Sequence, residues 1–267
     1  MKEINKFLFS FIFVSLLFIQ EEKCMGSFFK KESIITDIKY EKIEVNKLED
    51  IYSEREGDFV FSELNIDLRK LSVVKRKEAF IRLMLPSIKV VHKEILNNKR
   101  IVSILKSREN YTLEEEEYLK RIFKKYKVKY KDFKTLESKM VIYPTSLILA
   151  QGGLESAWGT SRFFREGNNA FGIWSSNKTE PRIAAKSSRK TFTAHLRSYG
   201  TLKETVEDIC MLISRAEAYK KVRDYINEGE NSYKIAEGLI RYSEEGRVYV
   251  KKIKGTLKYN HLEKYDK

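Results

Sequence analysis

The sequence predicts a mainly helical α+β domain with one small β-hairpin lobe. From residue 73 onward, apolar residues recur at three- and four-residue steps through most of the chain, as in amphipathic helices. This period disappears over 175–199, where two short runs, 179–183 and 190–196, are typical of the strands of a hairpin. The 267 residues, 42% of them apolar and few of them proline or glycine, suffice for one sizeable core.

The first helical pattern covers 73–105, and Pro86 inside it is expected to kink the helix or to start a second one. Thr112 and Glu115 fit a capping box at the start of the next helix. The basic stretch 124–139 is expected to be a loop with one short helical turn at most.

Pro144 suits the first turn of the following helix, which is expected to continue to a C-terminal stop at Gly159. Inside it, Gly152 and Gly153 each cost about 1 kcal/mol relative to alanine, so a close helix contact or nearby substrate is expected there. After the hairpin, with its turn near 187–188, helices are expected from about residue 201 and over 216–228, 233–242 and 245–257.

Residues 1–26 are expected to be a secretory signal peptide or an N-terminal anchor. Two lysines precede an apolar run over 7–19, which is shorter than the roughly 20 residues of a membrane span. Cys24 offers lipid attachment as an alternative, although charged residues stand before it. We therefore expect the protein to be exported to the periplasm or cell envelope, with membrane attachment through the N-terminus left open. Residues 27–72 are expected to be a weakly structured tether, and 73–262 the working domain.

The net charge of +14 favours a polyanionic partner: nucleic acid, anionic lipid or anionic polysaccharide. The lysines are scattered as on a solvated surface and no nucleic-acid-binding signature is present, so nucleic acid is not expected. Cys24 and Cys210 allow neither a disulfide framework nor a zinc site, and the three histidines are far apart. No metal or cofactor is expected.

Glu155 is the strongest candidate for chemistry. It shares a helical face with Gln151 and Trp158, and Leu154 and Phe171 add to an apolar surround. A carboxyl group in such a place can stay protonated near neutral pH and act as a general acid. The alternative is a structural carboxylate in a buried salt bridge.

A glycosidase usually needs a second carboxylate opposite the first. Glu180, in the expected hairpin, is the best candidate and Glu166 is the next. An exposed hairpin carboxylate without a catalytic role is an equally good interpretation of Glu180.

A polar and aromatic cluster follows the Glu155 helix, formed by Asn168, Asn169, Phe171 and Trp174. Amides both donate and accept hydrogen bonds, as sugar hydroxyl and acetamido groups require, and aromatic faces stack on pyranose rings. A structural turn with core aromatics is the alternative. Tyr242 ends a later helix and is either a hydrogen-bonding group in the cleft or a half-buried tyrosine.

Three segments resemble Bax-type proteins of the bacterial glucosaminidase family: LAQGGLESAWGTSRF (149–163), EGNNAFGIW (166–174) and IAEGLIRYSEEGRVYV (235–250). The resemblance runs in order over roughly 73–261. It implies a lysozyme-like helical domain with an N-terminal helical extension, which hydrolyses β-1,4 bonds after N-acetylglucosamine in peptidoglycan strands. It also implies that Glu155 is the general acid, that Tyr242 belongs to the site, and that Asn168, Asn169 and Phe171 line the cleft.

The chain departs from the family pattern in the hairpin, where 191–197 holds no carboxylate. Either Glu180 supplies the second group, or the substrate's acetamido group or a water held by Tyr242 does. The Glu155–Ser156 pair also resembles lytic transglycosylases, and a non-catalytic wall-binding protein is a further alternative. Substrate contacts are expected at Gln151, Ser156, Trp158 and Trp174, and the protein is expected to be a monomer.

Overall fold

The computed structural model describes residues 33–185 and 193–266, and Asp37–Lys267 forms one compact unit. The expected signal peptide, Cys24 and the hairpin turn at 187–188 lie outside the described residues. In the described part, no helix is both long enough and apolar enough to cross a membrane.

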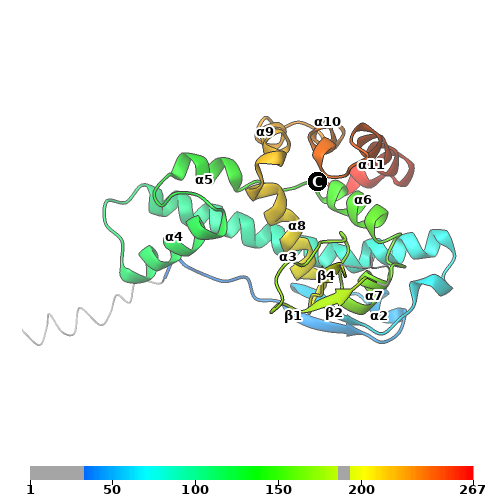
Figure 1. The fold of residues 1–267 in the computed structure, drawn as a ribbon. Helices are drawn as coiled ribbons and strands as arrows, with labels where there is room; N and C mark the ends of the chain where they lie inside the picture. The colour runs from blue at the N-terminus through cyan, green and yellow to red at the C-terminus, as the bar shows by residue number, and fades with distance from the viewer. Residues whose placement is uncertain (1–32, 186–192, 267) are drawn as a thin grey trace, which may run out of the picture. The chain divides into compact units, whose positions relative to one another are not determined.

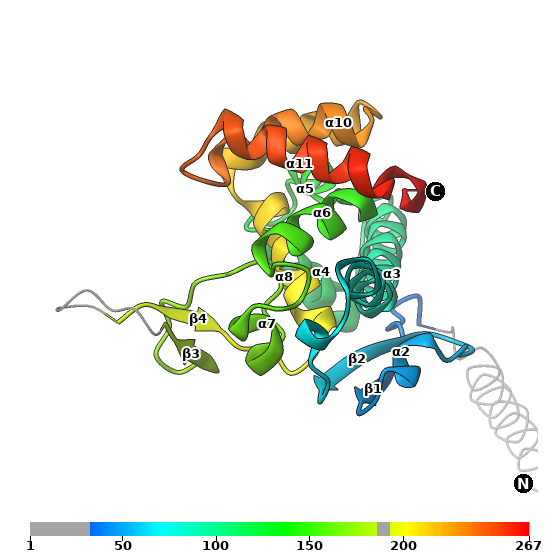
Figure 2. The same ribbon diagram turned by 90° about the vertical axis from the view of Figure 1, so that its right-hand side faces the viewer.

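One long helix, α3 (Val73–Lys106), is the element on which the others pack. Pro86 lies inside this helix, so of the two expected outcomes, a kink or the start of a second helix, the second is wrong. In both ribbon views the β1–β2 sheet lies on one side of α3, and α10 and α11 lie on the other (Figures 1 and 2). Helices α6 (Thr145–Glu155) and α8 (Leu202–Arg215) contact α3 directly.

The segment that was expected to be a weakly structured tether contains ordered elements. Strand β1 (Glu41–Val45) pairs in parallel with β2 (Phe59–Leu64), and α2 (Glu49–Tyr52) connects them. Val45 and Phe61 are buried in the core beneath α3. The prediction failed here because the apolar residues of this segment are sparse, and they face the core only once the two strands have paired.

Two short helices follow α3. Helix α4 (Leu113–Lys125) begins with the capping box of Thr112 and Glu115, as predicted. Helix α5 (Phe133–Lys139) replaces the loop that was expected over 124–139. It forms because Asp132 caps its first turn, and because Leu136 is completely buried.

The remaining elements complete the helical body and the hairpin. Strands β3 (Arg182–Ala184) and β4 (His195–Arg197) pair antiparallel, as the alternating runs predicted. The other helices are α7 (Arg162–Gly167), α9 (Lys220–Asn227), α10 (Ser232–Ile235) and α11 (Arg247–Asn260), with 3₁₀ turns at Leu68–Lys70, Glu217–Tyr219, Ala236–Arg241 and Leu262–Tyr265. The predicted mainly helical class with small sheets is confirmed.

Candidate active site

Helix α6 ends at Glu155, four residues before the predicted stop. Ala157, Trp158 and Gly159 then have φ values of 51°, 56° and 80°, so the chain makes a left-handed turn. Two consecutive non-glycine residues in this region are strained, and such strain gathers at functional sites. Trp158 is therefore not on the face of α6, as the helical spacing suggested, but folds back over it.

The turn is held by Ser156, whose hydroxyl donates to the Gly152 carbonyl at 2.6 Å and accepts from the Gly159 amide at 2.9 Å. Ser156 is buried, so it shapes the turn and does not face a substrate. The Trp158 indole covers Gly153 and meets Phe80 edge-on, with ring centroids 5.7 Å apart.

Glu155 lies at the open end of α6 with an exposed side chain, within reach of a substrate. Desolvation by the surrounding protein nevertheless raises the pKa of its carboxyl group. A hydrogen bond from the Tyr249 hydroxyl acts against this rise, the charge of Glu245 adds to it, and the Lys252 cation opposes it. Since the side chain is open to water, solvent screening limits all these charge effects.

A chain of buried polar groups positions the tyrosine beside Glu155. The Tyr143 hydroxyl donates to Gln151 Oε1 at 2.5 Å, and Gln151 Nε2 donates to the Tyr249 hydroxyl at 3.2 Å. Tyr143 and Gln151 are completely buried and Tyr249 nearly so. Gln151 is completely buried and therefore does not meet substrate as predicted; it donates to the Tyr249 hydroxyl, the group whose interaction with Glu155 lowers the pKa of that carboxyl group.

Asn169 is a structural residue of the site. Its amide nitrogen donates to the carbonyls of Ile173 and Arg197 at 3.0 and 2.9 Å, and Oδ1 accepts from the amides of Phe171 and Ile173. All four polar positions of this buried side chain are thus used to tie the hairpin to the body.

Asn168 also has a structural role. It ends α7 in the left-handed conformation, with φ at 52°, and its amide donates to the carbonyls of Ser62 and Tyr199. The interpretation of Asn168 and Asn169 as sugar-binding amides does not fit these contacts.

Phe171 and Tyr242 lie together near the catalytic candidate. Phe171 is buried in the core, so its ring is not available for stacking on a sugar. The Tyr242 hydroxyl donates to the Phe171 carbonyl at 3.4 Å, and its ring stacks on Tyr249 with centroids 5.2 Å apart. Burial raises the pKa of Tyr242, and the charge of Glu155 raises it further.

Trp174 differs from the other aromatic candidates, because 64% of its surface is exposed. A backbone bridge to Leu196 fixes it beside β4. Its ring is the predicted aromatic surface that remains open for a sugar.

The two carboxylates proposed as partners of Glu155 are both in ion pairs. Glu180 lies 3.3 Å from Arg197, which also binds Asp208 at 2.6 Å. Glu166 pairs with Arg162 at 3.0 Å. The carboxylate whose charge acts on Glu155 is instead Glu245, which pairs with Lys252 at 2.6 Å.

No role was expected for Tyr249, Glu245 or Lys252. Tyr249 and Lys252 stand three residues apart in α11, a spacing that places them on one helical face, and Glu245 precedes the helix and reaches Lys252 through an ion pair. The polar pair on one face of α11 was the signal that could have identified this side of the site.

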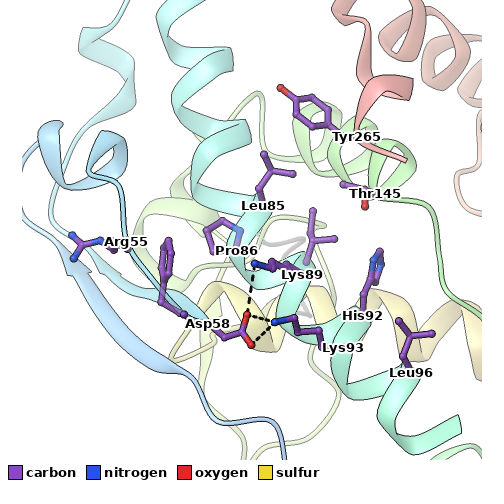
Figure 3. Close-up of a pocket in the computed structure, with 13 residues that line it drawn as sticks. Arg55, Asp58, Leu85, Pro86, Lys89, His92, Lys93, Leu96, Thr145 and Tyr265 are labelled. Carbon is purple, nitrogen blue, oxygen red and sulfur yellow. Dashed lines mark hydrogen bonds and ion pairs between the residues drawn. The ribbon is translucent and has the colours of Figure 1, made fainter. Parts of the chain in front are cut away.

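A hollow lies at the end of α6 that is away from Glu155, where Thr145 begins the helix (Figure 3). Eleven residues of helix separate its ends by about 16 Å, so this hollow is remote from Glu155. Its carboxylate, Asp58, points at Lys89 and Lys93, 3.9 and 2.7 Å away (Figure 3). The hollow lacks an unpaired acid and is not the catalytic centre.

Among residues 33–185 and 193–266, no three His, Cys, Asp or Glu side chains come together in a way that could hold a metal. Cys210 is buried, and burial raises the pKa of its thiol to about 12, in keeping with a small apolar core residue.

Residues 130–262, which contain Glu155 and the whole of α11, match the model of the glucosaminidase family, described as mannosyl-glycoprotein endo-beta-N-acetylglucosaminidase. This part of the chain belongs to the glucosaminidase family. It is thus a domain of a glycoside hydrolase family, and the resemblance predicted from 149–163 is confirmed.

Two curated relatives match part of the chain. Protein bax of Escherichia coli (strain K12) is 34% identical over 114 residues, which are 40% of this chain and 42% of that protein. Exo-glucosaminidase LytG of Bacillus subtilis (strain 168) is 31% identical over 130 residues, 45% of each protein. The matched part of the chain thus spans less than half the length of either relative.

One solved structure that matches the chain is the catalytic domain of the autolysin Auto from Listeria monocytogenes, at 18% identity and a TM-score of 0.38. The match covers 63% of this chain and 96% of the Auto chain. A peptidoglycan hydrolase from Sphingomonas sp. A1 is 24% identical with a TM-score of 0.38, over 50% of this chain and 85% of that one. TM-scores this low add nothing to the family assignment, which depends on the sequence match.

Proposed function

We propose that this protein is a peptidoglycan hydrolase that cleaves the β-1,4 bond after N-acetylglucosamine, with Glu155 as the general acid. The observation that carries the proposal is an exposed carboxyl group with a raised pKa at the end of α6, inside the family match. A raised pKa favours the protonated form that a general acid needs.

In the proposed reaction, the Glu155 carboxyl donates its proton to the glycosidic oxygen. The bond from that oxygen to the anomeric carbon breaks, and positive charge develops on the sugar ring. The oxygen of one water then bonds to the anomeric carbon, and the proton that this water releases is taken up by the site. Tyr249 holds the ionised Glu155 after transfer, because a hydroxyl donor stabilises the charged form.

Substrate contact is proposed at the exposed aromatic groups of the site. Trp174 offers its face on the hairpin side, and Trp158 offers the outer part of its indole beyond the α6 turn. Asn168, Asn169 and Ser156 support these surfaces from within. A monomer suffices for this arrangement, and the reaction as proposed needs no metal or cofactor.

A lytic transglycosylase is the second candidate, favoured by one observation: Glu180 is held by Arg197 and so is less suited to activate a water. A single acid that later acts as base fits that reaction, in which a hydroxyl of the muramic acid itself attacks the anomeric carbon. The two reactions differ in product, because the transglycosylase leaves an anhydro sugar and the hydrolase a reducing end.

The test uses purified full-length protein on isolated sacculi, with mass spectrometry of the released fragments. We expect fragments with reducing-end N-acetylglucosamine, and a loss of about 10²–10⁴-fold in turnover for Glu155→Gln, which keeps the shape but cannot donate the proton in the same way. Glu166→Gln is the matched control, because it neutralises an exposed carboxylate of α7 that lies in a surface ion pair.

Full activity of Glu155→Gln would refute the acid assignment. Anhydro-muramic products would select the transglycosylase. Binding to sacculi without any released fragment, from the wild-type protein, would show a wall-binding protein instead of an enzyme.

A further inference from the structure

A groove of about 490 Å³ is lined by Leu154 and Trp158, which stand one residue before and three residues after the proposed acid. Leu154 and the Trp158 indole form its floor at the end of α6, and α11 forms one wall. The first turns of α3 form the other wall through Lys77. The volume lies within the range of about 300–1,000 Å³ that is usual for small-molecule sites.

The charged side chains that line this groove are all cations: Lys77, Lys251 and Lys252. Lys252 also pairs with Glu245, outside the groove lining. The groove adjoins the acid in the chain, because Leu154, which lines it, directly precedes Glu155. An ammonium group donates hydrogen bonds and accepts none, so the groove suits carboxylates better than sugar hydroxyls, which both donate and accept.

Lys77 is fixed in position before any ligand arrives. Its ammonium group donates to the Asn260 side-chain oxygen at 2.7 Å and lies 5.0 Å from the centre of the Trp158 ring. The strained turn at 157–159 is what holds that ring under the lysine. A charge that is already ordered loses less side-chain entropy when it binds an anion.

The rest of the lining is apolar and open to solvent. Tyr259 is 83% exposed and Val248 is 53% exposed, and both belong to α11. Together with Leu154 they provide contacts for small apolar side chains between the cations. Three ammonium groups set among apolar surfaces match a short peptide with several free carboxylates.

We propose that this groove binds the carboxylate-bearing peptide stem of peptidoglycan, next to the glycosidic bond that Glu155 protonates. The inference depends on the proposed function for its choice of substrate. The stem is attached to muramic acid through a lactyl group, so it lies beside the glycan backbone and within reach of a groove that adjoins the acid. Since Lys77 lies outside the family match of 130–262, the segment before the match would contribute to the choice of substrate.

The kinetic test compares peptide-bearing glycan strands with the same strands after removal of the stems by an amidase. For Lys77→Met/Lys251→Met we expect KM on the peptide-bearing strands to rise about three- to tenfold, as expected for two exposed ion pairs. On the denuded strands both kcat and KM should equal those of the wild type. The control is Lys99→Met/Lys124→Met, which removes two exposed lysines of α3 and α4 and leaves the same net charge.

Lys251→Met alone, at an exposed position of α11, tests the groove without touching the Trp158 contact. It should raise KM on the peptide-bearing strands by about two- to threefold. An equal loss on both substrates, or no change on either, would overturn the peptide assignment.

A binding measurement separates this inference from the proposed hydrolysis. Calorimetry should show that the synthetic stem peptide L-Ala–D-Glu–L-Lys binds to Glu155→Gln. The binding should weaken when Lys77→Met and Lys251→Met are added to that variant. Amidation of the peptide carboxylates should abolish the binding. Lysine-dependent binding without any cleavage of sacculi would refute the hydrolase and keep the groove. Cleavage of sacculi without lysine-dependent binding would refute the groove and keep the hydrolase.

Discussion

Gly152 and Gly153 are adjacent in α6, yet replacing each by alanine should affect stability differently. A β-carbon added at Gly152 would lie 3.1 Å from the Phe80 ring and 3.4 Å from the Phe171 ring. A β-carbon at Gly153 would lie 3.1 Å from three atoms of the Trp158 indole. The contacts are equally short, so the outcome depends on whether the neighbouring ring can move.

Alanine in a helix interior is about 0.8–1.0 kcal/mol more favourable than glycine. Overpacking of a closed core costs about 1–3 kcal/mol. Phe80 and Phe171 are both buried, so Gly152→Ala should be neutral or destabilising, by roughly 0–2 kcal/mol. Trp158 is half-buried and can shift outward by a few tenths of an ångström, so Gly153→Ala should keep most of the helix gain and stabilise by up to about 1 kcal/mol.

Urea unfolding of the two variants measures this difference directly. The Gly153→Ala midpoint should lie above that of the wild type and the Gly152→Ala midpoint at or below it, with the slope m unchanged. Gly153→Ala should also raise KM on peptide-bearing strands, because the shifted indole no longer lies correctly beneath Lys77. If Gly152→Ala proved as stable as Gly153→Ala or more so, the ring contacts would not be the reason for the glycine pair.

Three further predictions concern the site. Glu245→Gln removes a charge that raises the pKa of Glu155, so the high-pH limb of the kcat/KM profile should move to lower pH. Lys252→Met removes a charge that lowers this pKa, so the same limb should move to higher pH. Tyr249→Phe removes the hydrogen bond to the ionised carboxyl group and should likewise move the limb to higher pH, as the same profile would show. Asn169→Ala removes four hydrogen bonds and leaves the amides of Phe171 and Ile173 without this acceptor, so it should destabilise the fold by roughly 3 kcal/mol, measured by thermal unfolding. A loss below about 0.5 kcal/mol would contradict the structural role of this amide.

The fold was predictable wherever one segment contains its own signal. The capping residue Thr112 and the apolar period of α8 identify helices without help from the rest of the chain. Strands β1 and β2 gave no such signal, because each is stabilised by pairing with a segment about 20 residues away and by burial under α3. Helix α5 was missed because seven residues contain one buried apolar side chain, too few to show a period.

The candidate acid Glu155 could be named from the sequence, and the roles of the polar residues assigned to its site could not, for a related reason. Residue types indicated that Gln151 and Asn169 are polar groups of the site, and the structure shows both as buried side chains bonded to other protein groups. Type alone could not show that every hydrogen-bonding position of the Asn169 side chain is already used by the protein. A polar residue next to an active site can bind substrate or support the residues that do, and only its hydrogen-bond partners distinguish the two.

Burial is the largest influence on the pKa of Glu155, and the charges that act on it come from Lys252 in α11 and from Glu245 just before that helix, almost a hundred residues further along the chain. Glu245 and Lys252 act on the carboxyl group with opposite signs and are bound to each other at 2.6 Å, so their effects largely cancel while the pair is intact. A substrate carboxylate that bound Lys252 would compete with Glu245 for the same cation. The freed charge of Glu245 would then raise the pKa of Glu155 further, and the acid would hold its proton more firmly when a peptide-bearing substrate is bound. The high-pH limb of kcat should accordingly lie at higher pH on peptide-bearing strands than on denuded strands, and Lys252→Met should remove that difference.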